Sequence, residues 1–250
     1  MRSTFYQRLL SQGVYFTAQG EFNTHLKPIL RNNFAFSELS AKFVVGLSIG
    51  VFTGVLSNAS NSIKHYAYRH PGDTPLGTAI KMLNKGGIAP FMNGIRPGVM
   101  RDMVFGSLYE SLNVISDQYI IEKIPKEHST FSNTAYGFSR FVAAIIATVA
   151  SSPFNHARAM QFDTPLHKKK KSTTAILVSC WLESDRVVKK ANADSKNKHG
   201  FARHIYFANK FNMGPGTIRS GAGMLISQLL FNKFTQKLKN LDEPQHKPRL

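Results

Sequence analysis

Long apolar stretches interrupted by small and polar residues dominate the chain. Four such stretches lie at residues 43–56, 103–121, 136–154 and 213–234. Each reaches about 20 residues once its small polar neighbours are included, which is the length of a membrane-spanning helix. Serines, glycines and a few charges recur within them, as in helices that pack around a polar interior. A soluble helical bundle is the alternative that this pattern leaves open.

Three glycines share one face of the first apolar stretch. Gly46, Gly50 and Gly54 are spaced by four residues, which places them on one side of a helix. In a soluble helix each would cost about 1 kcal/mol relative to alanine. Small residues at this spacing let membrane helices approach one another closely. The spacing therefore favours helix packing within a membrane.

The charges are distributed unevenly among the connections. The 250 residues carry a formal net charge of +18. Lys and Arg greatly outnumber the acids at 64–101 and 158–219, whereas 118–131 holds two residues of each sign. An excess of Lys and Arg on alternate connections is what the positive-inside rule predicts. We therefore expect the basic connections to share one side of a membrane.

The sequence lacks the common motifs of catalysis and metal binding. A single cysteine, Cys180, excludes an internal disulfide and a cysteine metal cluster. The nine histidines show no H-E-x-x-H spacing, and there is neither a P-loop nor a strand-linked G-x-G-x-x-G. We therefore expect a protein that is not an enzyme and has no cofactor or metal.

Two short patterns each occur twice. SNASNSIKHYA at 57–67 and SSPFNHARAMQ at 151–161 both follow an apolar stretch and share the spacing of their asparagine and their basic residue. Pro-Gly-x-x-Arg then opens the next apolar stretch, at 97–101 and again at 215–219. The same order of helix, polar cluster, basic connection and second helix therefore occurs twice, which indicates an internal repeat.

These motifs resemble those of the mitochondrial carrier family. That family has three repeats of two transmembrane helices, and its odd-numbered helices end in P-x-[D/E]-x-x-[K/R]. A signature of glycines with an aromatic and a basic residue precedes its even-numbered helices, and GGIAPFMNGIRPGVMR at 86–101 is similar to it. The resemblance implies an all-α membrane protein, a carrier-like helical bundle with amphipathic helices on the matrix side.

The start of the chain is similar to its end. SQGVYFTAQGEFN at 11–23 parallels SGAGMLISQLLFN at 220–232. The resemblance then implies one domain, with an open or partner-filled side in place of the family's first helix. Its parts are a remnant of repeat 1 at 1–36, repeat 2 at 37–124, repeat 3 at 125–240 with a long basic loop at 163–212, and a tail at 241–250. We expect five transmembrane helices, at 5–28, 37–66, 96–121, 133–161 and 213–238.

The resemblance also assigns gate roles to several polar positions. Carriers close each side with a network of ion pairs, and asparagine replaces most of the acids here. Asparagine forms hydrogen bonds but carries no charge, so these positions predict either braces for kinked helices or a gate that works by hydrogen bonds alone. The degenerate gate positions are Asn61, Lys64, Asn155 and Arg158 on the matrix side, and Asn23, Val114 and Asn232 on the other side.

The substrate contacts of the family are partly retained. Arg101 and Asp102 look like the arginine–acid pair of amino-acid carriers, and Arg219 matches the third contact. The first contact falls at Leu10, and leucine cannot bind a carboxylate. The resemblance therefore implies a remnant of a substrate site, whose arginines face a lipid headgroup, a neighbouring subunit or a ligand.

The long connection holds a basic run and an amphipathic segment. The segment 176–190 predicts an amphipathic helix at the membrane face, with Trp181 as an interfacial anchor. For the basic run we expect contact with an anionic phospholipid such as cardiolipin or with an acidic protein surface, and a solvated loop is the alternative. Nucleic acid is not expected, because no recognisable module or interleaved aromatics accompany the run. The run consists of Lys168, Lys169, Lys170 and Lys171.

Together these features predict a non-transporting carrier-fold protein of the mitochondrial inner membrane, with its basic loops facing the matrix. We expect an accessory or structural subunit of a large inner-membrane assembly, with a respiratory-chain complex as the first choice. A divergent transporter of an amino acid or small anion is the second interpretation. A basic nucleic-acid-associated protein is the third.

Overall fold

The regular structure of the chain is helical. The computed structural model describes residues 2–69, 72–119, 129–164, 170–194, 199–211 and 213–242, and within them every regular element is a helix. The all-helical fold predicted from the sequence is therefore confirmed for these residues. The elements are α1 (Arg2–Phe34), α2 (Glu38–Arg69), α3 (Pro75–Gly86), the 3-10 helix η1 (Ala89–Met92), α4 (Ile95–Tyr119), α5 (Ser129–Asp163), α6 (Thr173–Asp194), α7 (His199–Lys210) and α8 (Pro215–Asp242).

Each of the five long helices expected from the sequence is present, as α1, α2, α4, α5 and α8. Of the five predicted transmembrane helices, two within the described residues are long and apolar enough to cross a membrane, at Glu38–Tyr68 and Thr134–Asp163. α5 continues through Pro153, which has no amide hydrogen for the carbonyl of Val149. The hydroxyl of Ser152 donates to that carbonyl at 2.6 Å instead, so the helix continues beyond the proline.

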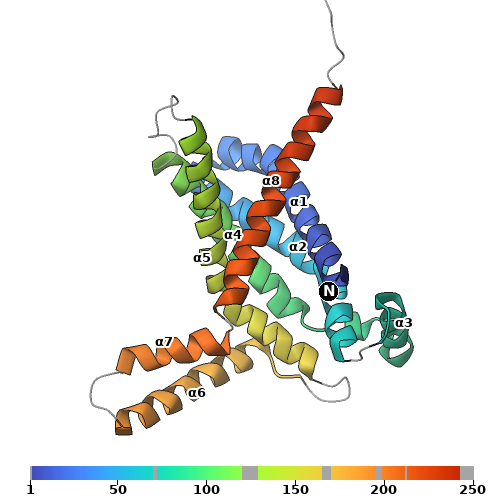
Figure 1. The fold of residues 1–250 in the computed structure, drawn as a ribbon, viewed down its shortest axis with the longest axis vertical. Helices are drawn as coiled ribbons and strands as arrows, with labels where there is room; N and C mark the ends of the chain where they lie inside the picture. Colours follow the sequence, from blue (N-terminus) through green and yellow to red (C-terminus); the bar gives the residue numbers. More distant parts are fainter. Residues whose placement is uncertain are drawn as a thin grey trace, which may run out of the picture.

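The long helices pack in the order α1, α2, α4, α5 and α8 (Figure 1). α8 runs diagonally across the bundle and contacts α1 as well as α5. Phe16 of α1 stacks on Phe231 of α8 with ring centroids 5.8 Å apart, and Phe16 is only 2% exposed. α1 and α8 are therefore in contact at these two rings, on the side where we expected an open or partner-filled gap.

α2 and α4 approach closely along the glycine face. A Cβ atom on Gly46 would meet the backbone of Gly106, and one on Gly50 would meet the carbonyl of Asp102. A Cβ atom on Gly54 would lie 2.8 Å from the Cα of Val99. The close packing predicted from the spacing of these glycines is thus confirmed, and it fixes the register of the two helices.

The two ends of the bundle differ in charge. At the lower end in Figure 1, α3 lies on one side and the hairpin of α6 and α7 on the other. At the upper end, Arg31 pairs with Glu38 at 3.0 Å, and other basic residues there also have carboxylate partners. The lower end carries an excess of cations. Its described Lys and Arg residues include Lys64, Lys81, Lys85, Arg96, Arg101, Arg158, Lys170 and Lys171.

Candidate functional site

One apolar cluster occupies the middle of the bundle. It takes buried side chains from all five long helices. Phe105 stacks on Tyr109 with centroids 5.7 Å apart, and Tyr15 packs against both rings. Apolar and aromatic side chains therefore occupy much of the interior where the five helices meet. The buried members are Tyr15, Phe16, Ala18 and Leu30 of α1, Ala41, Val45 and Ile49 of α2, Tyr109 of α4, Ala143, Ala144 and Ala147 of α5, and Met224 of α8.

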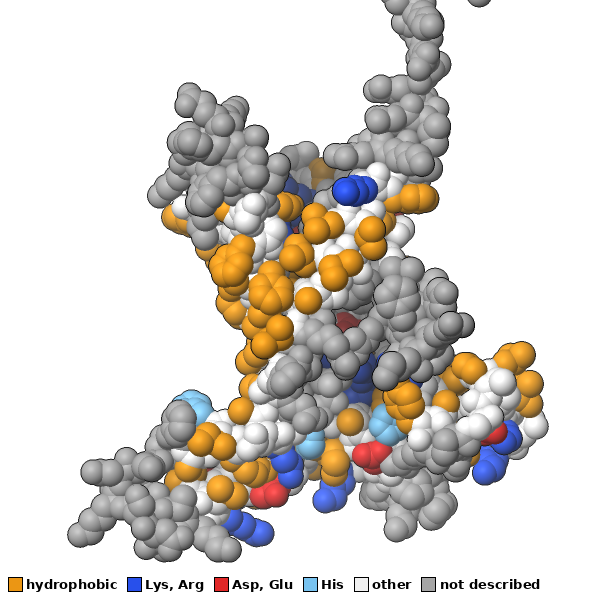
Figure 2. Space-filling model, in the orientation of Figure 1, with side chains coloured by type: hydrophobic (Ala, Val, Ile, Leu, Met, Phe, Trp, Pro, Cys, Tyr) orange, Lys and Arg blue, Asp and Glu red, His pale blue; other side chains and the backbone are white. Residues whose placement is uncertain are grey.

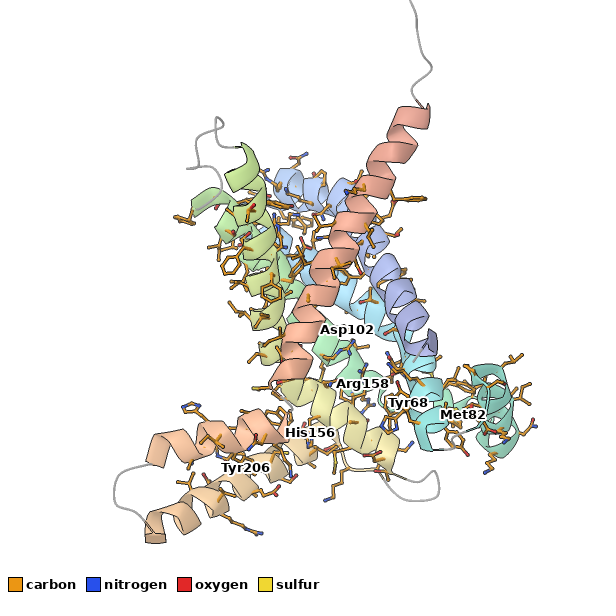
Figure 3. The ribbon with its side chains drawn as sticks, in the orientation of Figure 1. Tyr68, Met82, Asp102, His156, Arg158 and Tyr206 are labelled. Atoms are coloured by element: carbon orange, nitrogen blue, oxygen red, sulfur yellow. The ribbon has the colours of Figure 1, made fainter. Side chains whose placement is uncertain are left out.

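Arg101, Asp102 and Arg158 come together nearer the lower end (Figure 3). Arg101 Nε donates to Asp102 Oδ1 at 2.6 Å, and Asp102 is 9% exposed. Arg158 reaches from α5 to the first turn of α4, where a Cβ atom on Gly98 would lie 3.3 Å from its Cδ. The structure thus brings two predicted substrate-contact residues next to one predicted gate residue. The Asp102 carboxylate pairs with Arg101, and Arg158 lies close enough to interact with both charges.

The predicted gate residues near the lower end form bonds within their own helices. Asn155 Oδ1 accepts a hydrogen bond from Arg158 Nη2 at 2.9 Å, three residues along α5. Asn61 Nδ2 donates to Ser57 Oγ at 3.3 Å, four residues back along α2. Lys64 Nζ lies 5.7 Å from the centroid of the Tyr68 ring. These three contacts each lie within a single helix, which agrees with the first of the two roles expected for the asparagines.

Asn58 joins two elements, although the sequence did not single it out. Its Nδ2 donates to the carbonyls of Phe91 at 2.7 Å and Asn93 at 3.0 Å. Ser62 Oγ, one turn further along α2, donates to the carbonyl of Pro90 at 2.8 Å. These bonds hold η1 and the turn before α4 against α2. The only signal in the sequence was the four-residue spacing of Asn58 and Ser62, which places both on one helix face.

We expect Asn58→Ala to lower the free energy of unfolding by about 2 kcal/mol, because two carbonyls lose their donor in a buried place. Asn61→Ala removes a bond within one helix and should cost less than about 0.5 kcal/mol. Thermal unfolding of both variants in the same detergent measures the difference. Equal losses would contradict the role given to Asn58.

A buried polar cluster, which the sequence did not predict, joins three helices near the upper end. Glu110 of α4 is 1% exposed and accepts hydrogen bonds from Gln19 of α1 and Lys42 of α2. Lys42 Nζ lies 3.3 Å from Glu110 Oε2 and also donates to Asn23 Oδ1 at 2.6 Å. The predicted gate residue Asn23, on α1, thus binds a lysine of the neighbouring helix α2.

A second ion pair near the upper end joins α4 to α5. Arg140 Nη2 lies 2.7 Å from Asp117 Oδ2, and the guanidinium carbon of Arg140 lies 4.4 Å from the centroid of the Tyr136 ring. This ion pair therefore ties the end of α4 to α5. Val114, another expected gate position, is buried and apolar.

Some of the residues predicted from the sequence lie outside the described part of the structure. They are Lys168 and Lys169 of the basic run, and the side chains of Leu10, Arg219 and Asn232. Lys170 Nζ donates to Asn93 Oδ1, and burial lowers the pKa of Lys170. The end of the basic run is therefore folded against the turn that precedes α4.

α6 and α7 form a helical hairpin, of which the sequence predicted the segment 176–190. The ring of Trp181 stacks on Phe207 with centroids 5.9 Å apart, and the guanidinium carbon of Arg203 lies 4.8 Å from the Trp181 ring. Lys210 Nζ lies 2.9 Å from Glu183 Oε2, and its hydrogen bond holds the pKa of Glu183 below its usual range. α7 was not predicted, because its 12 residues lie within a polar, basic connection.

No family model, curated protein or solved structure matches the chain. The likeness to the mitochondrial carrier family therefore stays a prediction from the motifs.

The described residues contain no group of three His, Cys, Asp or Glu side chains that could hold a metal ion. Between α6 and α7 lies a shallow groove of about 620 Å³, bordered by Val187, Ile205 and Tyr206 together with the Glu183–Lys210 pair. The arrangement of the described side chains is that of packing and charge pairing between helices.

Proposed function

We propose that the protein is a non-transporting, carrier-like structural subunit of a mitochondrial inner-membrane assembly, with a respiratory-chain complex as the first choice. The observation that carries the proposal is the apolar cluster shared by all five long helices. Alternating access requires a substrate site near the middle of the membrane that opens to each side in turn. Packed aromatic rings at that level suit a helical frame better than a transport path.

The two polar ends support the same proposal. Near the upper end, the Lys42–Glu110 and Asp117–Arg140 pairs tie α2 to α4 and α4 to α5. Near the lower end, the gate asparagines bond within single helices. A transporter needs ion pairs that form and break in alternation at its two ends, whereas a frame needs bonds that persist.

The exposed side chains of the long helices support placement in a membrane rather than a soluble bundle. Phe52 and Leu56 of α2, Phe138 of α5 and Leu230 of α8 are all exposed. Apolar side chains cover much of the long helices in Figure 2. Monomeric soluble proteins rarely expose apolar surface on this scale. By the positive-inside rule, the basic lower end then faces the matrix, where its excess cations meet anionic phospholipid.

The purified chain reconstituted into liposomes is expected to show no saturable exchange of amino acids, carboxylates, phosphate or nucleotides. A transporting carrier reconstituted in parallel controls for the quality of the vesicles. Exchange that is saturable and abolished by Arg101→Ala would overturn the proposal. It would favour the second candidate, a divergent transporter, which the retained Arg101–Asp102 pair supports.

Assembly gives the complementary test. On native gels of mitochondrial membranes the chain is expected to migrate within a large complex that is lost when the chain is depleted. Re-expression of an Arg101→Ala, Arg219→Ala double variant should restore that complex as well as the wild type does. Migration of the wild type alone would contradict a structural role, and release by carbonate would favour the third interpretation, a soluble basic protein.

A further inference from the structure

The outer side of α6 exposes three apolar side chains close to the root of the hairpin. Val178, Trp181 and Leu182 are 51%, 52% and 55% exposed. Val178 and Leu182 are four residues apart and therefore lie on one side of the helix. Trp181 lies at the border between this side and α7, where part of its ring stacks on Phe207. Exposed apolar groups that cluster in this way mark an interaction surface more often than isolated ones do.

The opposite side of α6 is already occupied. Ile176, Cys180 and Ser184 recur every four residues and are at most 3% exposed. This side packs against α7 and the end of α5, which are the elements that α6 contacts most. Half a helical turn separates these residues from Val178 and Leu182, so the two apolar side chains point away from α7.

The direction of this outer side follows from the place of the hairpin. Figure 1 shows α7 above α6, on the side of the long helices. The outer side of α6 therefore faces away from the apolar band of α2, α5 and α8. If that band lies in a membrane, the outer side of α6 faces the aqueous phase and not the lipid.

The charges of the hairpin leave this side basic. Both acids near it are paired within the hairpin, Glu183 with Lys210 and Asp185 with Arg203. Arg186 and Lys189 are exposed and belong to no ion pair among the described residues. A basic edge next to an apolar patch is complementary to an apolar surface edged by Asp and Glu.

We propose that Val178, Trp181 and Leu182, with Arg186 and Lys189 at their edge, form the docking surface for a neighbouring protein subunit that presents an apolar patch with an acidic rim. A large aromatic anchor beside aliphatic groups, with charges at the rim, is the usual composition of such a contact. The inference rests on the proposed function, because it names the surface through which the chain would join its assembly.

Leu182→Glu places a charge in the centre of this surface. Loss of an anchor contact weakens association strongly, so the fraction of the chain that migrates within the complex should fall at least about tenfold. The full chain is expressed in its own mitochondria for this test. The matched control is His204→Glu, which adds the same charge at an exposed position on α7 and should leave assembly unchanged.

Retention of Leu182→Glu in carbonate-washed membranes, with an unchanged melting temperature after purification, shows that the variant folds. If it does not fold, the Arg186→Glu, Lys189→Glu double variant takes its place, because both side chains are exposed. That variant should weaken assembly and make the remaining complex more sensitive to salt.

Wild-type chain that migrates alone refutes the proposed function. Wild-type chain within a complex that Leu182→Glu and the double variant leave intact refutes only the docking surface.

Trp181 is the single tryptophan of the chain, so its fluorescence reports directly on this surface. The purified chain is placed in nanodiscs of anionic phospholipid. We expect aqueous acrylamide to quench the fluorescence of Trp181, and lipids brominated in their acyl chains to quench it hardly at all. Strong quenching by the brominated lipids would identify the membrane as the occupant and overturn the proposal.

Discussion

Replacement of Gly50 by alanine is expected to lower the free energy of unfolding by about 3 kcal/mol, the upper end of the usual cost of overpacking. The new Cβ atom would meet the backbone carbonyl of Asp102, which belongs to a helix and cannot move alone. α2 and α4 would have to separate, and the neighbouring approach of Gly46 to Gly106 would be lost with them. Thermal unfolding of the purified chain in detergent measures the loss.

Gly20→Ala is the matched control. Gly20 lies inside α1, and a Cβ atom there would meet nothing within 4 Å. Alanine is favoured over glycine in a helix by about 1 kcal/mol, so this variant should be as stable as the wild type or more so. The same substitution is thus expected to have opposite signs in two helices. A Gly50→Ala variant that behaves like Gly20→Ala would contradict the close contact of α2 with α4.

Local patterns were sufficient to locate the long helices. Apolar stretches of membrane-spanning length and the Pro-Gly-x-x-Arg starts placed α2, α4, α5 and α8 close to their observed bounds. The four-residue spacing of Gly46, Gly50 and Gly54 predicted the closest helix contact, because a row of residues without side chains leaves room for little except another backbone. Such features are encoded within one helix and its immediate neighbours in the sequence.

Pairings between helices could not be read in the same way. Lys42 and Glu110 are 68 residues apart, and each lies alone among apolar or small neighbours. Only the packing of α2 on α4 brings them together. The contact of Phe16 with Phe231 depends on the tilt of α8 across the bundle, and no pattern within either helix sets that angle. The family motifs drew attention to Asn61, whereas the interhelical bonds are made by Asn58, one turn away.

Glu110→Leu is expected to destabilise the protein by about 3 kcal/mol, because it leaves Lys42, whose side chain is only 19% exposed, without its carboxylate. Lys42 would keep only the amide oxygen of Asn23 as a partner from this cluster. A Lys42→Leu, Glu110→Leu double variant removes both charges together. Apolar replacement of a complete buried pair is often neutral, so the double variant should recover stability to within about 1 kcal/mol of the wild type.

The pair of Asp73 and Lys81 provides the control for these two variants. Its N–O distance of 2.7 Å is shorter than the 3.3 Å between Lys42 and Glu110, but the Lys81 side chain is 57% exposed. Exposed pairs contribute between about 0 and 1 kcal/mol, so Asp73→Leu should change the melting temperature little. If Glu110→Leu costs no more than Asp73→Leu, the buried network does not hold the upper end together. If the double variant is as unstable as Glu110→Leu, the loss comes from the altered packing around Glu110 and not from the isolated charge of Lys42. If Glu110→Leu loses stability and the double variant regains it, the two charges stabilise this end of the bundle only as a pair.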